Sequence, residues 1–192
     1  MNFTENNSII IVTGLPRSGT SMMMQLLQQG GITILTDEIR QHDINNPKGY
    51  FEYEKVKTLS TDTSWLPIAQ GKAVKIISHF IEFLPAHFDY KIILMERPIE
   101  EVLLSQQKML GKEASALPTM LKDIFSKQLE QCKAYITQQK NMELLVLNYP
   151  NVISKPNEEI NNMVAFLQKD LNTKAMLNVV DKTLHRNKIN SI

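Results

Sequence analysis

Apolar residues are concentrated in five short runs, which are separated by longer polar or mixed stretches. The runs occupy residues 8–13, 32–35, 73–77, 91–95 and 142–147. Each run is four to six residues long and rich in Ile, Val and Leu, which is typical of strands that are buried on both faces. We therefore predict a core of about five strands.

Helical periodicity and strong helix formers characterise most of the remaining chain. The predicted helices cover residues 18–29, 99–108, 118–139 and 156–167. Gly30 follows the first helix and Pro156 opens the last, as glycine and proline commonly do. Strands that alternate with helices predict an α/β three-layer sandwich with a mostly parallel sheet and ligands at the carboxyl ends of the strands. No linker divides the chain, so we expect a single domain over residues 1–192.

Composition limits the range of partners. Of the 192 residues, 43% are hydrophobic and 21% are charged, and the formal net charge is only +1. This balance gives no general attraction to nucleic acid or to an anionic membrane, so any anion site must be built locally. Residues 1–7 lack the features of a secretory signal, and no run reaches the ~18 apolar residues of a membrane span. We expect a cytoplasmic protein with no integral membrane segment.

The first strand run leads into the loop Gly14-Leu15-Pro16-Arg17-Ser18-Gly19-Thr20-Ser21, and a helix follows. Glycines spaced in this way between a strand and a helix let backbone N–H groups surround a phosphate at the helix N-terminus. The loop predicts a P-loop NTPase-like fold. A triphosphate-binding loop would carry lysine after Gly19, whereas the cation here is Arg17, which argues against a triphosphate ligand. The simpler interpretation is a tight turn with a solvated Arg17.

In this context the loop resembles the 5′-phosphosulfate loop of the sulfotransferases, which have lysine or arginine where Arg17 stands and a hydroxyl residue after the glycine. The resemblance implies that the chain binds 3′-phosphoadenosine-5′-phosphosulfate (PAPS) and transfers its sulfuryl group in line to a hydroxyl or amine acceptor without a metal. The nucleotide would be bound by Gly14, Pro16, Arg17, Ser18, Gly19, Thr20 and Ser21.

A second pair of residues fits the same family, which binds the 3′-phosphate with an arginine at a strand end and a serine eight residues later. Arg97 and Ser105 have this spacing, and Pro98 opens the helix between them. A solvated arginine and a surface serine are the alternative. The family also has a late basic segment, for which Arg186 in residues 184–188 is the candidate; it could instead be a basic helix end.

The family resemblance also suggests the base that deprotonates the acceptor. Glu38 stands 21 residues after Arg17, which is similar to the acidic base of tyrosylprotein sulfotransferases. Lys75 and His79 resemble the Lys-x-His pair of cytosolic sulfotransferases, with the histidine two residues late. Lys75 would assist the leaving oxygen. Glu52 is an alternative acid, although an acidic residue in such a loop is more often a solvent-exposed charge without a catalytic role. The simpler interpretation of Glu38 is a helix cap, and that of His79 is a hydrogen-bonded structural histidine.

Two other functions fit the same residues. One is a small P-loop kinase that uses ATP and Mg²⁺, with Arg17 in place of the missing lysine. The other is a nucleotide-binding module that has lost catalysis. For the transferase, we expect a small-molecule, lipid or carbohydrate acceptor, no nucleic acid partner, and a small or open pocket that a second subunit of a homodimer could complete.

Overall fold

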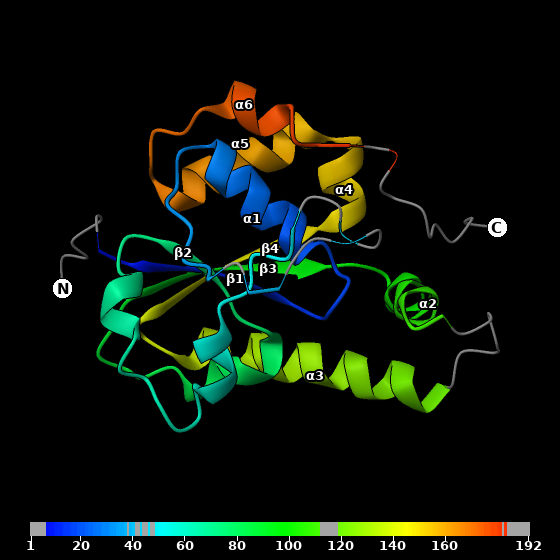
Figure 1. Cartoon of the computed structure of the whole chain (residues 1–192), viewed down its shortest axis with the longest axis horizontal. Helices are drawn as coiled ribbons and strands as arrows, with labels where there is room; N and C mark the ends of the chain where they lie inside the picture. Colours follow the sequence, from blue (N-terminus) through cyan, green and yellow to red (C-terminus); the bar gives the residue numbers. More distant parts are fainter. Residues whose placement is uncertain are drawn as a thin grey trace.

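The computed structural model describes residues 7–37, 39–40, 43, 46, 49–111, 119–181 and 183. Its centre is a parallel sheet, seen edge-on in Figure 1. The strands are β1 (Ile9–Gly14), β2 (Ala73–Lys75), β3 (Tyr90–Glu96) and β4 (Met142–Asn148), in the order β2-β1-β3-β4. All three pairings are parallel, so the four carboxyl ends lie along one edge of the sheet.

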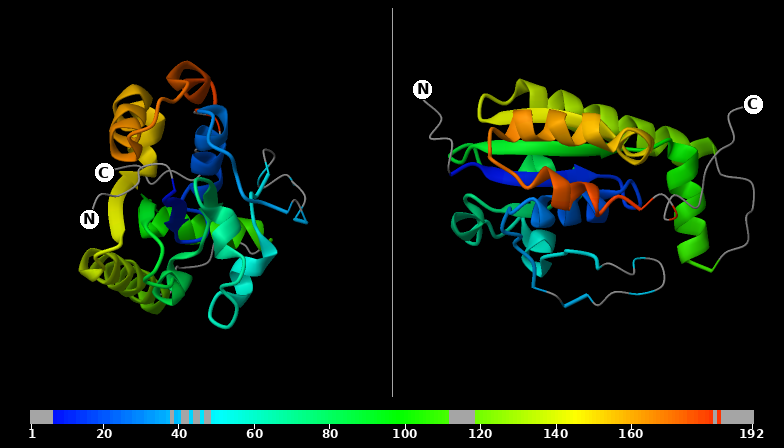
Figure 2. Two further views of the ribbon diagram at one scale, coloured as in Figure 1. Left: turned by 90° about the vertical axis from the view of Figure 1, so that its left-hand side faces the viewer. Right: turned by 90° about the horizontal axis from the view of Figure 1, so that it is seen from above.

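Helices cover both faces of this sheet (Figures 1 and 2). One face carries α1 (Thr20–Gln29), α4 (Tyr149–Ser154), α5 (Pro156–Leu167) and α6 (Thr173–Leu177). The other carries α3 (Thr119–Gln138) and the 3₁₀ helices η1 (Glu54–Thr58), η2 (Leu66–Ala69) and η3 (Ser78–Phe83). Helix α2 (Ile99–Met109) lies beyond the carboxyl end of β3. The predicted three-layer α/β architecture is confirmed.

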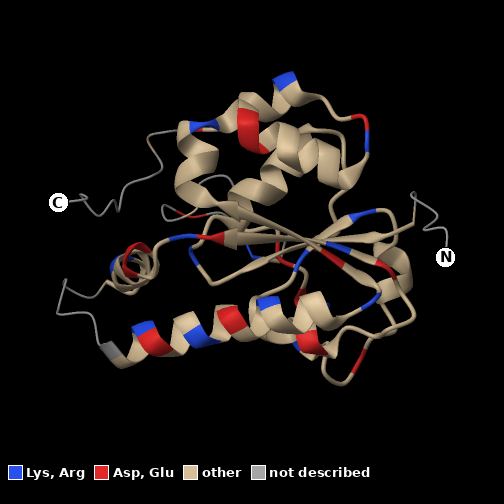
Figure 3. Ribbon diagram, turned by 180° about the vertical axis from the view of Figure 1, so that it is seen from behind, with Lys and Arg blue, Asp and Glu red and all other residues tan. Residues whose placement is uncertain are grey.

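Alternation along the central strands divides the core into two parts. Ile9 and Ile11 of β1 pack with α3 residues such as Ile136, whereas Ile10 and Val12 pack with the α1 and α5 side. Because successive side chains of a strand point to opposite faces, a continuously apolar strand must be covered on both sides. Charged residues of both signs occur along the outer side of α3 (Figure 3), in agreement with the low net charge.

One predicted strand is not formed. Residues 32–35 make only an isolated parallel bridge, between Ile34 and Ala73, so the sheet has four strands in the described part of the chain. The amide of Leu35 donates to the carbonyl of Ala73, and the amide of Ala73 donates to that of Thr33. The pairing stops at this first residue of β2, and the next residues bond elsewhere: Oγ1 of Thr36 and the amide of Asp37 both donate to the carbonyl of Glu52. The predicted helices begin and end within two residues of α1, α2, α3 and α5, while α4 and α6 were not predicted.

Candidate functional site

The loop between β1 and α1 lies at the carboxyl edge of the sheet. Its backbone is unusual, since Gly19 has φ 102° and Arg17 has φ 74°, a value that is rare for a residue with a side chain. A Cβ at Gly14 would lie 2.6 Å from the carbonyl oxygen of Met95 on β3. The first turn of α1 contains no acidic residue. The loop and the start of α1 therefore form a concave, electropositive surface that suits an anion.

Position 19 has room only for glycine, because a residue that is distant in the sequence packs against it. A Cβ at Gly19 would overlap the ring of Tyr149, the first residue of α4. The ring of Tyr149 also lies under the guanidinium of Arg97, with the guanidinium carbon 4.8 Å from the ring centroid. Tyr149 thus packs between the loop and the end of β3 and holds the two at a fixed separation.

The structure brings together the two sequence motifs that were predicted to form one site. Nε of Arg17 donates a hydrogen bond of 3.0 Å to Oγ of Ser105 on α2. Arg97, just after β3, donates from Nη1 to the backbone carbonyl of Arg17 at 3.2 Å. These contacts link residues 88 and 80 positions apart. They also fix the loop in the backbone conformation that Arg17 would otherwise adopt rarely.

Arg97 is oriented by a buried ion pair. Its Nε donates to Oε2 of Glu101 at 2.8 Å, and both side chains are only 6% exposed. Glu101 lies in the first turn of α2, and its i, i+4 spacing from Arg97 brings its carboxylate back to the strand end. A buried arginine without a carboxylate partner would be costly. Glu101 therefore allows a cation to be kept at the edge of the cavity.

The long loop after α1 forms the opposite wall of the same cavity. Lys75, the last residue of β2, donates to the backbone carbonyl of Tyr50, and its Nζ lies 3.6 Å from Oε1 of Glu52. Burial lowers the pKa of the Lys75 ammonium to about 8, and the nearby Glu52 carboxylate partly opposes this shift. Arg40 reaches the same Glu52 oxygen at 2.9 Å.

Tyr50 and Asn46 attach this loop to the rest of the site. The guanidinium carbon of Arg40 lies 3.5 Å above the centroid of the Tyr50 ring, whose hydroxyl donates to Asp43 at 2.8 Å. Nδ2 of Asn46 donates to Oγ of Ser21 at 3.0 Å. The loop is therefore joined to the first turn of α1 as well as to β2.

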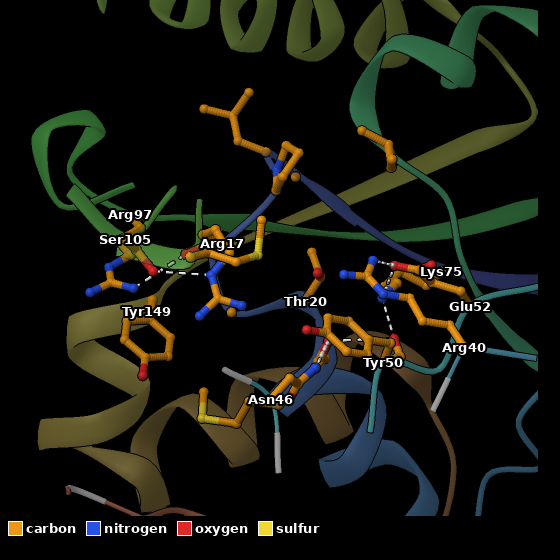
Figure 4. Close-up of a pocket in the computed structure, with 18 of the residues that line it drawn as sticks. Arg17, Thr20, Arg40, Asn46, Tyr50, Glu52, Lys75, Arg97, Ser105 and Tyr149 are labelled. Atoms are coloured by element: carbon orange, nitrogen blue, oxygen red, sulfur yellow. Dashed lines mark hydrogen bonds and ion pairs between the residues drawn. The ribbon is translucent and has the colours of Figure 1, made fainter. Parts of the chain in front are cut away.

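One cavity is shared by both walls (Figure 4). We call Arg17, Arg97, Ser105 and Tyr149 the Arg97 side, and Arg40, Tyr50, Glu52 and Lys75 the Lys75 side. In Figure 4, Thr20 at the start of α1 lies between the two groups. The described lining residues include five cations and a single carboxylate, namely Arg17, Arg40, Lys75, Arg97, Lys108 and Glu52. Burial lowers the pKa of the Arg17 guanidinium. A cavity whose lining has this excess of cations over carboxylates suits a polyanion better than a neutral ligand.

Most of the sequence-predicted site residues meet at this cavity. It is lined by Gly14, Pro16, Arg17, Gly19, Thr20, Ser21, Lys75, Arg97 and Ser105. Ser18 is buried beneath the loop, and its hydroxyl has no hydrogen-bond partner among the described residues. His79 is exposed on η3, where its ring contacts that of Phe80 in a tilted arrangement with a centroid distance of 4.0 Å, and it is not among the lining residues. Glu38 and Arg186 lie outside the described residues.

Sequence reasoning missed Arg40, Glu101 and Tyr149, and it treated Glu52 mainly as a loop charge. Glu101 could have been found from its i, i+4 spacing to Arg97. No local signal marked Arg40, because its contacts to Tyr50 and Glu52 depend on the path of the whole loop. The described residues contain no cluster of three or more His, Cys, Asp or Glu side chains arranged to hold a metal.

A comparison with protein-family models matches the sulfotransferase domain over residues 7–190. The chain belongs to the sulfotransferase family. None of the curated proteins matches the sequence significantly. Within the described part of this chain, no helix has both the length and the apolar character needed to cross a bilayer.

Solved structures of sulfotransferases share the fold. Mouse sulfotransferase SULT7A1, in complex with PAP, has a TM-score of 0.55 and 16% identity, with 94% of this chain and 64% of the mouse chain covered. Sulfotransferase STF1 from Mycobacterium tuberculosis has a TM-score of 0.54 and 17% identity, with coverages of 88% and 70%. The sulfotransferase domain of the curacin biosynthetic pathway has a TM-score of 0.51 and 12% identity, with coverages of 97% and 93%. The present chain thus spans 64% of the length of the mouse enzyme.

Proposed function

We propose that this sulfotransferase-family chain binds PAPS in the cavity between β1, β3 and the long loop, and transfers its sulfuryl group to a hydroxyl or amine acceptor. The observation that carries the proposal is the hydrogen bond between Arg17 and Ser105, with Arg97 bound to the carbonyl of Arg17. Two motifs that the family uses for the two ends of one nucleotide converge on a single cavity.

The loop is assigned to the 5′-phosphosulfate. The backbone N–H groups of residues 14–20 and the start of α1 would bind its oxygens, with Thr20 and Arg17 contributing side chains. Arg97 and Ser105 would bind the 3′-phosphate, and Arg186 remains a candidate for the same phosphate. Arginine suits this role because its guanidinium stays charged and can form paired hydrogen bonds to an oxyanion.

During transfer, the acceptor oxygen or nitrogen attacks sulfur while the bond between sulfur and the 5′-phosphate oxygen breaks. Negative charge develops on that leaving oxygen, and cations fixed in advance stabilise it. Lys75 and Arg17 are the cations placed to do so, from the two walls of the cavity. Transfer without a metal stays a prediction, as do the cytoplasmic location, the single domain, the homodimer and the identity of the small-molecule, lipid or carbohydrate acceptor.

A thermal-shift comparison tests which nucleotide binds. The ligands are PAPS, its desulfated product 3′-phosphoadenosine-5′-phosphate (PAP), ADP, and ATP with Mg²⁺. A ligand that binds only the folded chain raises its stability according to the ratio of concentration to Kd, ~2.7 kcal/mol at 100 times Kd. We expect PAP and PAPS to raise the melting temperature well above the value with ADP. Stabilisation by ATP with Mg²⁺ alone would refute the proposal in favour of a kinase.

Transfer itself needs a second assay, because a nucleotide-binding module would also bind PAP. Incubation with ³⁵S-labelled PAPS and a panel of phenols, alcohols, amines, sugars and lipids should label at least one acceptor. Tight binding of PAP with no labelled product, and no release of sulfate to water, would instead indicate a module that has lost catalysis.

A further inference from the structure

Glu52 is the only carboxylate among the described residues that line the cavity. We infer that Glu52 is the general base that accepts the proton of the acceptor hydroxyl. This inference rests on the proposed function. The inference puts the base on the Lys75 side of the cavity and differs from the two candidates predicted from the sequence, Glu38 and His79.

The two oxygens of the Glu52 carboxylate differ in their surroundings. Oε1 is bound by Arg40 at 2.9 Å and lies 3.6 Å from Nζ of Lys75. Oε2 makes no hydrogen bond to any other described residue. The side chain of Glu52 is 32% exposed, against 8% for Lys75. Glu52 is thus held by one oxygen and offers the other to a ligand that enters the cavity.

The backbone of Glu52 is fixed as well. Its carbonyl accepts hydrogen bonds from Oγ1 of Thr36 at 2.8 Å and from the amide of Asp37 at 3.3 Å. Arg40 adds a second restraint, because its guanidinium is stacked on the Tyr50 ring while it binds Oε1. Arg40 is therefore a positioning residue, and it acts through Glu52.

The location relative to Lys75 fits the direction of the reaction. Lys75 is assigned to the leaving oxygen, and Glu52 is its immediate neighbour on the solvent-exposed side. Figure 4 shows both on the same wall, across Thr20 from Arg17 and Arg97. An acceptor that enters beside Arg40 would meet Glu52 before it reaches the loop.

The other acidic and basic groups nearby have different contacts. Asp43 accepts the hydroxyl of Tyr50 at 2.8 Å. Asp37 accepts the backbone amides of Ile39 and Glu54 at 3.1 and 2.5 Å, which is a structural role in the loop. His79 contacts the Phe80 ring and is not among the residues that line the cavity. Within the described part of the site, Glu52 alone combines a carboxylate, a fixed position and access to the cavity.

The proton transfer balances without any further reactant. The acceptor O–H gives its proton to Oε2 of Glu52 as its oxygen forms the bond to sulfur. The bond between sulfur and the 5′-phosphate oxygen breaks, and its electron pair stays on PAP, next to Lys75 and Arg17. Glu52 returns the proton to water after the products leave.

The test compares Glu52→Gln with wild type on two acceptors. The amide keeps the shape of the carboxylate but cannot accept the proton. With an alcohol acceptor, or with water in PAPS hydrolysis, kcat should fall ~100- to 10,000-fold, the usual contribution of a general base. With a nitrophenol that is already ionised at the assay pH, the loss should be under ~10-fold, because no proton has to be removed. The Kd for PAP should change by less than ~2-fold, since no nucleotide contact is assigned to Glu52.

Glu54→Gln is the matched control, because Glu54 lies two residues further on, is 53% exposed and pairs with Lys57 instead of facing the cavity. It should keep wild-type rates on every acceptor. Equal losses on the alcohol and the ionised phenol would make Glu52 a structural residue and overturn the inference, as would a large loss in His79→Ala with none in Glu52→Gln. A wild-type chain that binds PAP but turns over neither acceptor nor water would refute the transfer reaction itself, and the role of Glu52 with it.

Discussion

The Arg97 side and the Lys75 side of the cavity are built in different ways. Arg97 and Ser105 come from a strand end and from the helix that follows it, and the Arg97–Glu101 pair is almost completely buried. Arg40 and Glu52 come from a long loop, with side chains that are 46% and 32% exposed. The comparison suggests a division of labour, in which the rigid side recognises the nucleotide and the more open side meets the acceptor. Four predictions can break or sharpen this division.

The largest effect is expected from Gly19→Ala. The new methyl group would overlap the Tyr149 ring and displace it from Arg97, so the Arg97 side should lose its geometry. Overpacking of this kind costs ~1–3 kcal/mol in stability, and PAP binding should fall below detection. Chemical unfolding and calorimetry measure the two effects.

Gly31→Ala provides the control for backbone strain. Gly31 has the same φ of 102°, but a Cβ there would meet no atom within 4 Å. It should show only the smaller cost of a positive φ and should keep PAP binding. If the two variants behave alike, the contact between Gly19 and Tyr149 does not shape the site.

Arg17→Ala should weaken both PAPS binding and transfer, because Arg17 is assigned to the 5′-phosphosulfate and is bound to Ser105. Loss of charge-assisted hydrogen bonds worth ~3 kcal/mol corresponds to a Kd that is ~100-fold weaker. Lys155→Ala, which removes an exposed cation paired with Glu158, should leave Kd unchanged. A 100-fold loss in kcat with no change in Kd would place Arg17 in chemistry alone.

The low pKa of Lys75, on the opposite wall of the cavity, predicts that the rate of transfer depends on pH. Burial lowers its pKa to about 8, so the ammonium is charged below that pH and loses its charge as pH rises through it. If the charged form is required, kcat/KM should fall about tenfold between pH 7 and pH 9. Lys75→Arg, which stays charged at both values, should remove this dependence. A flat wild-type profile would exclude Lys75 from the reaction.

The smallest effect is expected from Ser105→Ala. It removes one hydrogen-bond partner of Arg17 and one proposed ligand of the 3′-phosphate, worth ~1 kcal/mol or about fivefold in Kd for PAP. Binding of AMP, which has no 3′-phosphate, should change less. An equal loss for AMP would mean that Ser105 acts only through Arg17.

The same comparison explains how much could be predicted from the sequence. Arg17, Arg97 and Ser105 stand at fixed offsets from strand ends, and parallel strands bring such ends to one edge of a sheet. Their convergence could therefore be predicted from the element order. Arg40 and Glu52 belong to a loop whose path is set by hydrogen bonds such as Asn46 to Ser21, and no local pattern encodes that contact.

The fold shows the same limit. Continuous apolar runs located β1, β3 and β4 within two residues, because a strand buried on both faces leaves that signal. The run at residues 32–35 carried the same signal but pairs only through Ile34 with Ala73, because the residues that follow it bond to Glu52 instead of continuing along β2. Strand length is set by tertiary partners, which the run itself does not reveal.

The most direct test of the proposed PAPS site is calorimetric titration of the wild-type chain with PAP and with AMP. The two nucleotides differ only in the 3′-phosphate that Arg97 and Ser105 are proposed to bind. Two hydrogen bonds to a charged group, at ~1.5 kcal/mol or more each, predict that PAP binds at least ~100-fold more tightly than AMP. Equal affinities, or no binding of PAP, would contradict the assignment of this cavity to PAPS.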